Sequence, residues 1–378
     1  MHTKKMHSAI IILVSLALVI AVSLTSYATD MQNNNPEMPP PNFTVAFIGD
    51  SGWEAGFEAV LNLMKDEGVD LVLHQGDLAY SSNASGFFGK IDTILGTDFP
   101  YLASIGNHDT GSWPSNCGRA NGCYANFLTA RMAANGIVPD DPDLDDEKYA
   151  VTYQGLRIVF IGQNGNLEEF AQFLNDQLPV DDKAWKICSM HRTQKELQVG
   201  DKSSQMGWDV FHNCFNVGAI VATAHEHSYS RTRTLINPET QTVDAVCPDA
   251  DAVCLDNGKS FVFVSGLGGE EGRIDAQSRC LPTTFPYGCN QEWASIYTSS
   301  QGANFGALFI TFHVDGDPYK ARGYFKDIDG VVADEFTITL NSNEPPATAT
   351  PTATATATPT ATVDPTEYPW HILFPFIR

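Results

Sequence analysis

The most restrictive feature of this sequence is a series of short apolar runs that each end in glycine and a polar, potentially metal-binding side chain. The runs at 43–48, 69–73 and 101–105 recur at roughly the length of one β–α–β unit, about 30 residues. A helical pattern of apolar residues that includes Phe57 fills the gap between the first two runs. This order predicts parallel strands with helices on the faces of the sheet. Because ligands bind at the carboxyl ends of such strands, we expect the polar residues there to converge.

The same arrangement returns later in the chain. Apolar runs at 185–190 and 217–224 end in His191 and in the sequence His225-Glu226-His227. Because alternate residues of a strand point to the same side, His225 and His227 are expected to face one way.

The remainder of the core decides the fold class. Residues 111–146 are rich in Gly, Asn, Asp and Pro and are expected to form a long irregular insertion at the surface. The last third reads mainly as strands, at 260–265, 306–314, 319–325 and 335–340. We therefore predict an α/β protein in which two packed mixed β-sheets are flanked by helices.

Each polar residue has an ordinary explanation when it is taken alone. Glycine followed by aspartate suits a tight turn, a single histidine is more often structural than a ligand, and a tyrosine is commonly part of a core. Turns do not explain why five successive strand ends all deliver such residues. The candidate ligands are Asp50, Asp77, Tyr80, Asn107, His191, His225 and His227.

The chemistry of this set is coherent. Aspartate, asparagine and histidine together suit hard or borderline cations. Seven candidates are too many for one tetrahedral ion and suit two ions that share a carboxylate. Two metals held roughly 3.5–4 Å apart can clamp both the attacking and the leaving oxygen of a phosphoryl group.

The motifs resemble those of the calcineurin-like metallophosphoesterases, and among them the purple acid phosphatases. The family pattern appears here, over about residues 45–235, as Gly49-Asp50-Ser51-Gly52, Gly76-Asp77-Leu78-Ala79-Tyr80, Gly106-Asn107-His108, His191, Ala224-His225-Glu226-His227 and Ser228-Tyr229-Ser230-Arg231. The resemblance implies the αββα sandwich of that family. It also implies two metal ions, with His108 over the pocket to stabilise the phosphoryl group or protonate the leaving oxygen.

The resemblance also assigns the ligands to the two metals. It implies a first metal held by Asp50, Tyr80 and His227, a second held by Asn107, His191 and His225, and Asp77 as the bridge. A phenol ionises near neutral pH only beside a strongly acidic cation, so Fe(III) is expected at Tyr80. Zinc, iron or manganese is expected at the second position.

Some positions depart from the family pattern. Ala224 replaces the usual glycine, and Ser230 replaces the usual glutamate. The residues after His191 lack the second histidine with which many members bind phosphate. Arg192 or Lys195 could supply that charge, and each could equally be a surface residue, so the substrate range stays open.

Three functions fit these features. The first is hydrolysis of phosphomonoesters by attack of a metal-activated hydroxide, as in the purple acid phosphatases. The second is a phosphodiesterase or nucleotide-cleaving enzyme on the same scaffold, with the insertion at 111–146 deciding between the two. The third is a surface-attached binding protein that keeps metals for structure alone. With 45 acidic against 22 basic residues and a net charge of −23, no nucleic-acid partner is expected.

The ends of the chain carry their own signals. Residues 1–28 read as a signal peptide cut after Ala28, with an uncleaved N-terminal anchor as the alternative. The expected order is then a flexible lead at 29–42, the catalytic domain at 43–340, a Thr/Ala/Pro-rich linker at 341–367 and an apolar tip at 368–378. The tip is either a sorting or surface-attachment signal or a sticky tail. No transmembrane span is expected in the mature chain, which also lacks room before residue 43 for the N-terminal β-sandwich of large plant members.

The eight cysteines agree with export. An even number in an exported chain indicates disulfides. Short loops favour Cys117–Cys123, Cys247–Cys254 and Cys280–Cys289, which leaves Cys188–Cys214, although 105 pairings are formally open. We expect a secreted or cell-surface protein.

Overall fold

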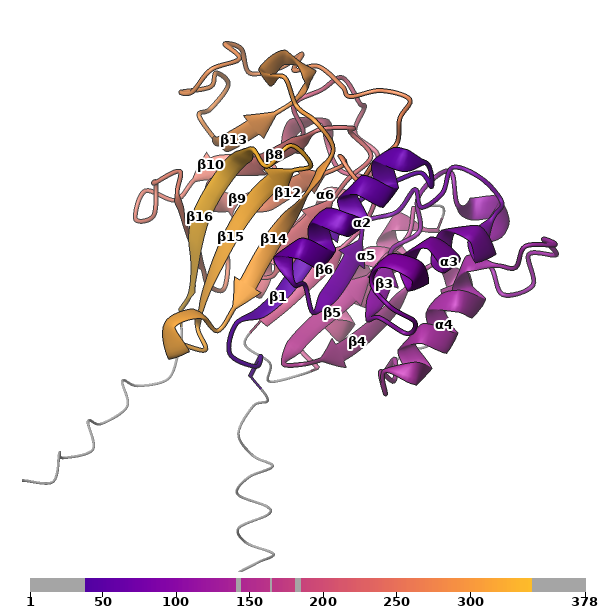
Figure 1. Ribbon diagram of the computed structural model, residues 1–378. Helices are drawn as coiled ribbons and strands as arrows, with labels where there is room; N and C mark the ends of the chain where they lie inside the picture. The colour runs from indigo at the N-terminus through magenta and orange to yellow at the C-terminus, as the bar shows by residue number, and fades with distance from the viewer. Residues whose placement is uncertain (1–37, 141–143, 164, 181–184, 342–378) are drawn as a thin grey trace, which may run out of the picture. The chain divides into compact units, whose positions relative to one another are not determined.

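The computed structural model describes residues 38–140, 144–163, 165–180 and 185–341. They form two mixed seven-stranded β-sheets with helices on the outer faces, as the sequence predicts (Figure 1). The expected leader at 1–28 and the expected tip at 368–378 lie outside the described residues. So do residues 29–37 of the lead and 342–367 of the linker, and the domain boundaries stay predictions.

The first sheet contains the strands that begin and end the domain. Its order is β11 (Ala252–Leu255), β16 (Val332–Leu340), β15 (Lys320–Asp327), β14 (Gly306–Phe312), β1 (Phe43–Ile48), β2 (Leu71–His74) and β3 (Tyr101–Ala103). Strands β1, β2 and β3 are parallel to one another, as their spacing predicts, whereas β1 pairs antiparallel with β14.

The second sheet is built from the middle of the chain. Its order is β13 (Trp293–Tyr297), β8 (Tyr229–Thr232), β12 (Val262–Ser265), β7 (Ile220–Thr223), β6 (Trp185–Ser189), β5 (Leu156–Phe160) and β4 (Tyr149–Tyr153). Strands β5, β6, β7 and β12 are parallel. A two-stranded ribbon of β9 (Leu235–Asn237) and β10 (Thr242–Val243) lies apart from both sheets.

Helices cover the two outer faces. Contacts join α2 (Ala55–Glu67) to β14 and α4 (Tyr124–Ala134) to β3, and α3 (Ala84–Ile94) packs between these two helices. Helices α5 (Leu167–Gln177) and α6 (Trp208–Asn216) pack together over the second sheet. Alternation along β5 shows the layering, because Ile158 and Phe160 belong to the core between the sheets while Val159 packs under α5 and α6.

Aromatic side chains fill the space between the sheets. The Phe47 and Phe263 rings lie edge to face with centroids 5.2 Å apart. Tyr229 of the second sheet stacks on Phe325 of the first at 4.3 Å. Such pairs add to the free energy gained from burying their area. The sheets are thereby held in one relative position, which matters because both contribute to the site.

A buried ion pair also crosses between the sheets. Arg231 on β8 donates from Nε to Asp334 Oδ2 of β16 at 2.6 Å and from Nη2 to Oδ1 at 2.9 Å. The guanidinium lies 3.8 Å from the Phe336 ring centroid, and the Tyr229 hydroxyl donates to the same carboxylate at 2.6 Å. Arg231 thus has a structural role at the end of the last sequence motif.

The segment at 111–146 differs from expectation. Rather than an irregular insertion at the surface, it contains α4, whose Tyr124 and Leu128 are fully buried. The four-residue spacing of Tyr124, Leu128 and Met132 is the helical signal that the Gly- and Asn-rich surroundings obscured.

Four disulfides are present, and they are the pairs expected from proximity. They are Cys117–Cys123, Cys188–Cys214, Cys247–Cys254 and Cys280–Cys289. The Cys188–Cys214 bond joins β6 to α6 in the core beneath the second sheet. Disulfides of this number indicate folding in an oxidising compartment. Within the described ranges, no helix combines the length and apolarity needed to cross a bilayer.

Candidate metal centre

The loops that follow five strands of the two sheets meet at one end of the domain. Loops after β1, β2 and β3 come from the first sheet, and loops after β6 and β7 come from the second. They bring together all of the side chains that the sequence predicts as ligands, namely Asp50, Asp77, Tyr80, Asn107, His191, His225 and His227. These side chains fall into two clusters.

The first cluster joins residues from both sheets. The Tyr80 hydroxyl lies 2.9 Å from Asp50 Oδ1 and 3.0 Å from His227 Nε2. His227 Nε2 is in turn 3.4 Å from Asp50 Oδ1. Three donor atoms that converge at such separations can share one cation.

The second cluster is centred on His191. Its Nε2 atom lies 3.1 Å from Asn107 Oδ1, 3.1 Å from His225 Nδ1 and 3.3 Å from Asp77 Oδ2. One ligand atom each of Asp77, His191 and His225 lies within 4.8 Å of the others, close enough for the three to share an ion. The division into two clusters agrees with the division that the motif resemblance implies, and the assignment of each side chain as a ligand stays a prediction.

Four of the seven candidates adopt a backbone conformation that is rare for residues with side chains. Asp50, Asp77, Tyr80 and His225 have φ values of 55°, 57°, 51° and 69°. Each such residue costs of order 1–3 kcal/mol and persists only where its surroundings hold it. The clustering of left-handed residues at these positions is typical of a functional site.

The paired histidines correct one argument from sequence. Strand β7 ends at Thr223 and β8 begins at Tyr229, so His225 and His227 lie in a loop rather than on alternate positions of a strand. The left-handed turn at His225 sends the two imidazoles apart, His225 toward His191 and His227 toward Tyr80. Both reach the site, but they do so in different clusters.

Backbone carbonyls orient two of the imidazoles. His191 Nδ1 lies 2.8 Å from the Gln75 carbonyl oxygen, and His227 Nδ1 lies 3.3 Å from the Arg273 carbonyl oxygen. An Nδ1–H that donates to a carbonyl leaves Nε2 free as a lone-pair donor, the usual arrangement around metal-binding histidine. Asp275 also accepts from the His227 backbone N–H at 2.9 Å, so the segment 273–275 fixes that residue twice.

The side chains of Asp77 and His191 strongly affect each other's pKa. Burial acts to raise the pKa of the Asp77 carboxyl, but the charge and hydrogen bond of His191 hold it below its usual range. Burial acts to lower the pKa of His191, yet Asp77 raises it to about 9. A cation that binds here must displace the His191 proton, so cation affinity should fall as the pH falls below about 9.

The Tyr80 phenol is held in its neutral form by its surroundings. Burial, together with the charges of Asp50 and Asp77, raises the pKa of Tyr80 far above its ordinary value. Ionisation of this phenol therefore requires a strong positive charge beside it.

Asp109 supports the loop that carries Asp77. Its buried carboxylate accepts backbone N–H groups of Asp77 at 2.8 Å, Leu78 at 2.9 Å and Gly106 at 2.8 Å. The loops also approach closely, since a Cβ on Gly106 would lie 2.0 Å from the Asp77 backbone nitrogen. Asp109 directly follows the third motif, but nothing in the sequence showed that it accepts these N–H groups.

Replacing Asp109 with asparagine should weaken cation binding. One carboxylate oxygen becomes an NH₂ group that faces backbone N–H donors, so the Asp77 loop relaxes. Outer-shell changes of this kind lower metal affinity about 10- to 100-fold, and we expect that loss in a calorimetric titration with Zn²⁺. Asp92→Asn, at a partly exposed partner of Arg131 that does not line the pocket, is the matched control. Wild-type zinc affinity in Asp109→Asn would contradict the supporting role.

A pocket of about 380 Å³ opens over the two clusters. His108 lies at this opening with about half of its side chain exposed, its ring 4.5 Å from the Tyr80 ring, and its backbone N–H donating to Asp77 Oδ1 at 2.8 Å. The complete lining is Asp77, Tyr80, Asn107, His108, Lys202, His225, His227, Glu270, Gly272 and Arg273.

The charged residues at the rim of this pocket were not predicted from the sequence. Lys202, Glu270 and Arg273 line it, whereas Arg192 and Lys195 do not. Nor does any described residue of the segment 111–146, so that segment does not supply the walls that the sequence assigned to it. These rim residues belong to no motif, so the sequence alone did not indicate that they line the pocket.

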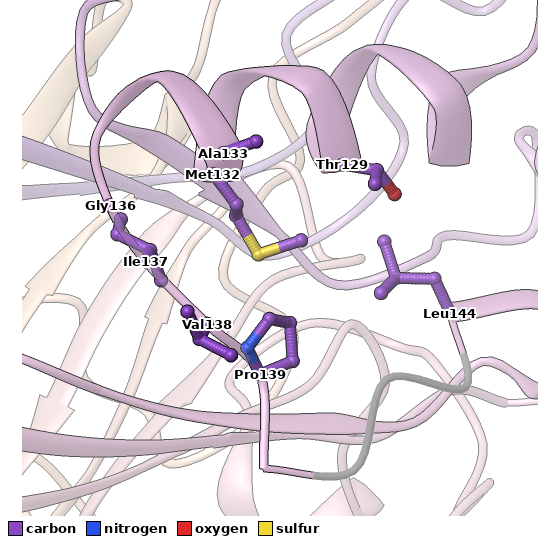
Figure 2. A pocket seen from close by; sticks show the side chains of 8 residues that line it. All are labelled: Thr129, Met132, Ala133, Gly136, Ile137, Val138, Pro139 and Leu144. Atoms are coloured by element: carbon purple, nitrogen blue, oxygen red, sulfur yellow. The ribbon is translucent and has the colours of Figure 1, made fainter.

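A second pocket offers different chemistry. About 370 Å³ in volume, it lies beside the end of α4, where Figure 2 shows Met132, Ile137, Val138 and Leu144 around the hollow. Its lining includes no titratable side chain. Such a pocket cannot supply acid, base or metal ligands, whereas the pocket over the two clusters can supply all three.

The chain was compared with known families and structures. Residues 43–229 match the family model of the calcineurin-like phosphoesterases. No protein with a curated description matches the chain. The purple acid phosphatase PPD1 from yellow lupin (Lupinus luteus) seeds is a structural neighbour with 21% identity and a TM-score of 0.56. The match covers 80% of this chain but 55% of the lupin chain, and it supports the fold alone.

Two further structures are more distant. PhoD matches with 13% identity and a TM-score of 0.45, covering 82% of this chain and 73% of its own. GAP50 of Plasmodium, the anchor in the inner membrane complex, matches with 11% identity and a TM-score of 0.48, covering 80% and 90%. Neither score supports an argument about this chain. The family match, in contrast, spans every loop that delivers a candidate ligand, and residues 43–229 therefore form a domain of the calcineurin-like phosphoesterases, which are generally metal-dependent phosphoester hydrolases.

Proposed function

We propose that this chain is a secreted phosphatase of the purple acid phosphatase type, which hydrolyses phosphomonoesters with two metal ions. Fe(III) is proposed at the cluster of Asp50, Tyr80 and His227. Zinc, iron or manganese is proposed at the cluster of Asn107, His191 and His225, with Asp77 between them. Carboxylate, phenol, amide and imidazole donors fit hard and borderline cations of this kind.

The observation that carries the proposal is the place of Tyr80. Its hydroxyl lies within 3.0 Å of both Asp50 Oδ1 and His227 Nε2, as a third donor to the same position. A buried phenol beside two carboxylates is costly to ionise and has no evident use in a site for zinc or manganese alone. A trivalent cation is the charge that suits it.

When bound, the two ions would supply the activation of a water molecule and the positive charge that stabilises the phosphoryl group. The chain's own residues have separate tasks. Asp77 orients His108 through its backbone N–H, and the half-exposed His108 ring extends over the pocket. From there His108 would donate a proton to the oxygen of the departing alcohol.

A visible absorption spectrum tests the proposal directly. Purified wild-type protein should show iron by metal analysis and a broad visible band, and Tyr80→Phe should lose the band. Tyr101→Phe is the matched control, because that buried phenol has no hydrogen-bond partner in the described part of the chain. A colourless wild-type protein with a full complement of metal and no iron would refute the assignment.

Substrate comparison tests the reaction itself. Faster turnover of 4-nitrophenyl phosphate than of bis(4-nitrophenyl) phosphate supports the monoesterase, and the reverse order supports the diesterase. If the metal-loaded protein turns over neither ester, and adding chelator changes nothing, the result would favour a binding protein.

A further inference from the structure

We propose that Lys202 is the residue that binds the phosphoryl group of the substrate. This inference rests on the phosphatase function proposed above. It assigns a task to a side chain that lies outside every sequence motif and far from the strand ends that supply the candidate ligands.

Lys202 lies in the pocket at the second cluster. It comes from the loop between β6 and α6 and lines the opening together with Asn107, His108 and His225. Its charge acts on His225, whose pKa is lowered to about 3 by burial first and then by the charge of His191, with Lys202 contributing. The ammonium group is therefore close to the face of the site where a phosphoryl oxygen would approach.

Lys202 is also the uncommitted cation of this pocket. Among the described residues, no acidic side chain forms an ion pair with its ammonium group. Arg273, the other cation of the lining, donates from Nε to Asp275 Oδ1 at 2.8 Å and is about half exposed. The charge of Lys202 also acts on the buried carboxyl of Glu226. A cation beside a polar pocket that makes no direct ion pair is suited to an anionic ligand.

The loop that carries Lys202 is held in place. Gln198 donates from its side-chain nitrogen to the Lys202 carbonyl oxygen at 2.5 Å. Arg279 donates to the Gln198 carbonyl oxygen at 2.8 Å. Gly200 packs directly on the buried Glu226 side chain, since a Cβ there would lie 1.6 Å from Glu226 Oε1. The backbone of the loop is thus fixed, and the side chain of Lys202 starts from a defined position.

A cation in the pocket would help to offset the negative charge of the whole chain. With a net charge of −23, the protein surface repels a phosphate dianion. Arg192 and Lys195, the candidates nearest in sequence to His191, do not line the pocket. Lys202 does line the pocket and can supply the positive charge there.

Kinetics of 4-nitrophenyl phosphate hydrolysis, with inhibition by inorganic phosphate, test the proposal. Lys202→Met keeps the length of the side chain and removes its charge. We expect KM and the phosphate inhibition constant to rise about 10- to 100-fold, the loss of one charge-assisted hydrogen bond. The kcat value and the metal content should change little. Lys195→Met, on the exposed neighbouring turn, should behave as the wild type.

A second variant separates binding from a structural role. Lys202→His should bind phosphate like the wild type at pH 5.5 and like Lys202→Met at pH 8, because the imidazole titrates between them. A merely structural lysine would give no such pH dependence. Wild-type KM and wild-type phosphate inhibition in Lys202→Met would overturn the proposal.

Failure of the proposed function can be told apart from failure of this inference. If the metal-loaded wild type hydrolyses no ester, calorimetric titration with inorganic phosphate still compares wild type with Lys202→Met. Weaker phosphate binding by the variant supports Lys202 as the anion-binding residue even then. Equal binding by the two proteins, or none by either, refutes it.

Discussion

Replacing Asp77 with asparagine should reduce phosphomonoester hydrolysis by about 1000-fold or more, a loss typical of removing a central charge-stabilising group. Asparagine keeps the shape of the side chain and can still accept the His108 N–H. It lacks the negative charge that balances His191. That charge would also balance the two cations of the proposed site. The ratio kcat/KM and the metal content per chain, measured on the same preparation, check this prediction.

Asp70→Asn is the matched control for that experiment. Asp70 also accepts a backbone N–H, from Thr44 at 2.8 Å, but it lies at the opposite end of β1 from the site. Its loss should leave turnover unchanged. If Asp77→Asn retained a tenth of wild-type activity, the shared carboxylate would be placed at the wrong residue.

Replacing Asp334 with alanine should destabilise the protein by about 3–5 kcal/mol, because it leaves the Arg231 guanidinium buried without a counterion. Arg231 is 1% exposed, so water cannot compensate for the lost carboxylate. The Tyr229 hydroxyl loses its acceptor in the same step. Urea unfolding of the disulfide-intact protein, followed by tryptophan fluorescence, measures the change.

The double variant Arg231→Met/Asp334→Ala sharpens this test. Removing both charges should recover a large part of the lost free energy of unfolding, since the penalty comes from an unpaired charge rather than from a missing contact. Arg322→Met/Glu335→Ala, which removes an ion pair more than half exposed between β15 and β16, should cost little. A small effect of Asp334→Ala alone would show that the guanidinium finds other partners.

Much of the fold could be predicted from sequence because its signals are local. Strands β1 and β12 are short, mainly apolar runs, and such runs identify strands without tertiary information. Strand β8 was missed because its fully buried residues include Arg231, whose partner lies about a hundred positions away. No local pattern reveals a buried arginine whose counterion comes from another sheet.

For the site, too, the features with local sequence signals could be predicted and those that depend on distant contacts could not. The candidate ligands follow strands and carry chemistry of their own, so order and spacing were enough to collect them. The left-handed backbone at His225 and the presence of Lys202 in the pocket depend on how loops pack against each other. Those features arise from contacts between segments with no common motif, and the sequence alone could not supply them.

The pairing of β1 with β14 has a consequence for how the protein folds. The hydroxyls of Thr44 and Thr311 meet at 2.9 Å across a separation of 267 residues. Closing so long a loop is slow, and until it closes β1 has an unpaired edge. The candidate metal centre, whose first ligand in the chain is Asp50, should therefore form late in folding, after nearly the whole domain has been synthesised. A fragment that ends before residue 306 would keep every candidate ligand and lack the strand that seats the first of them.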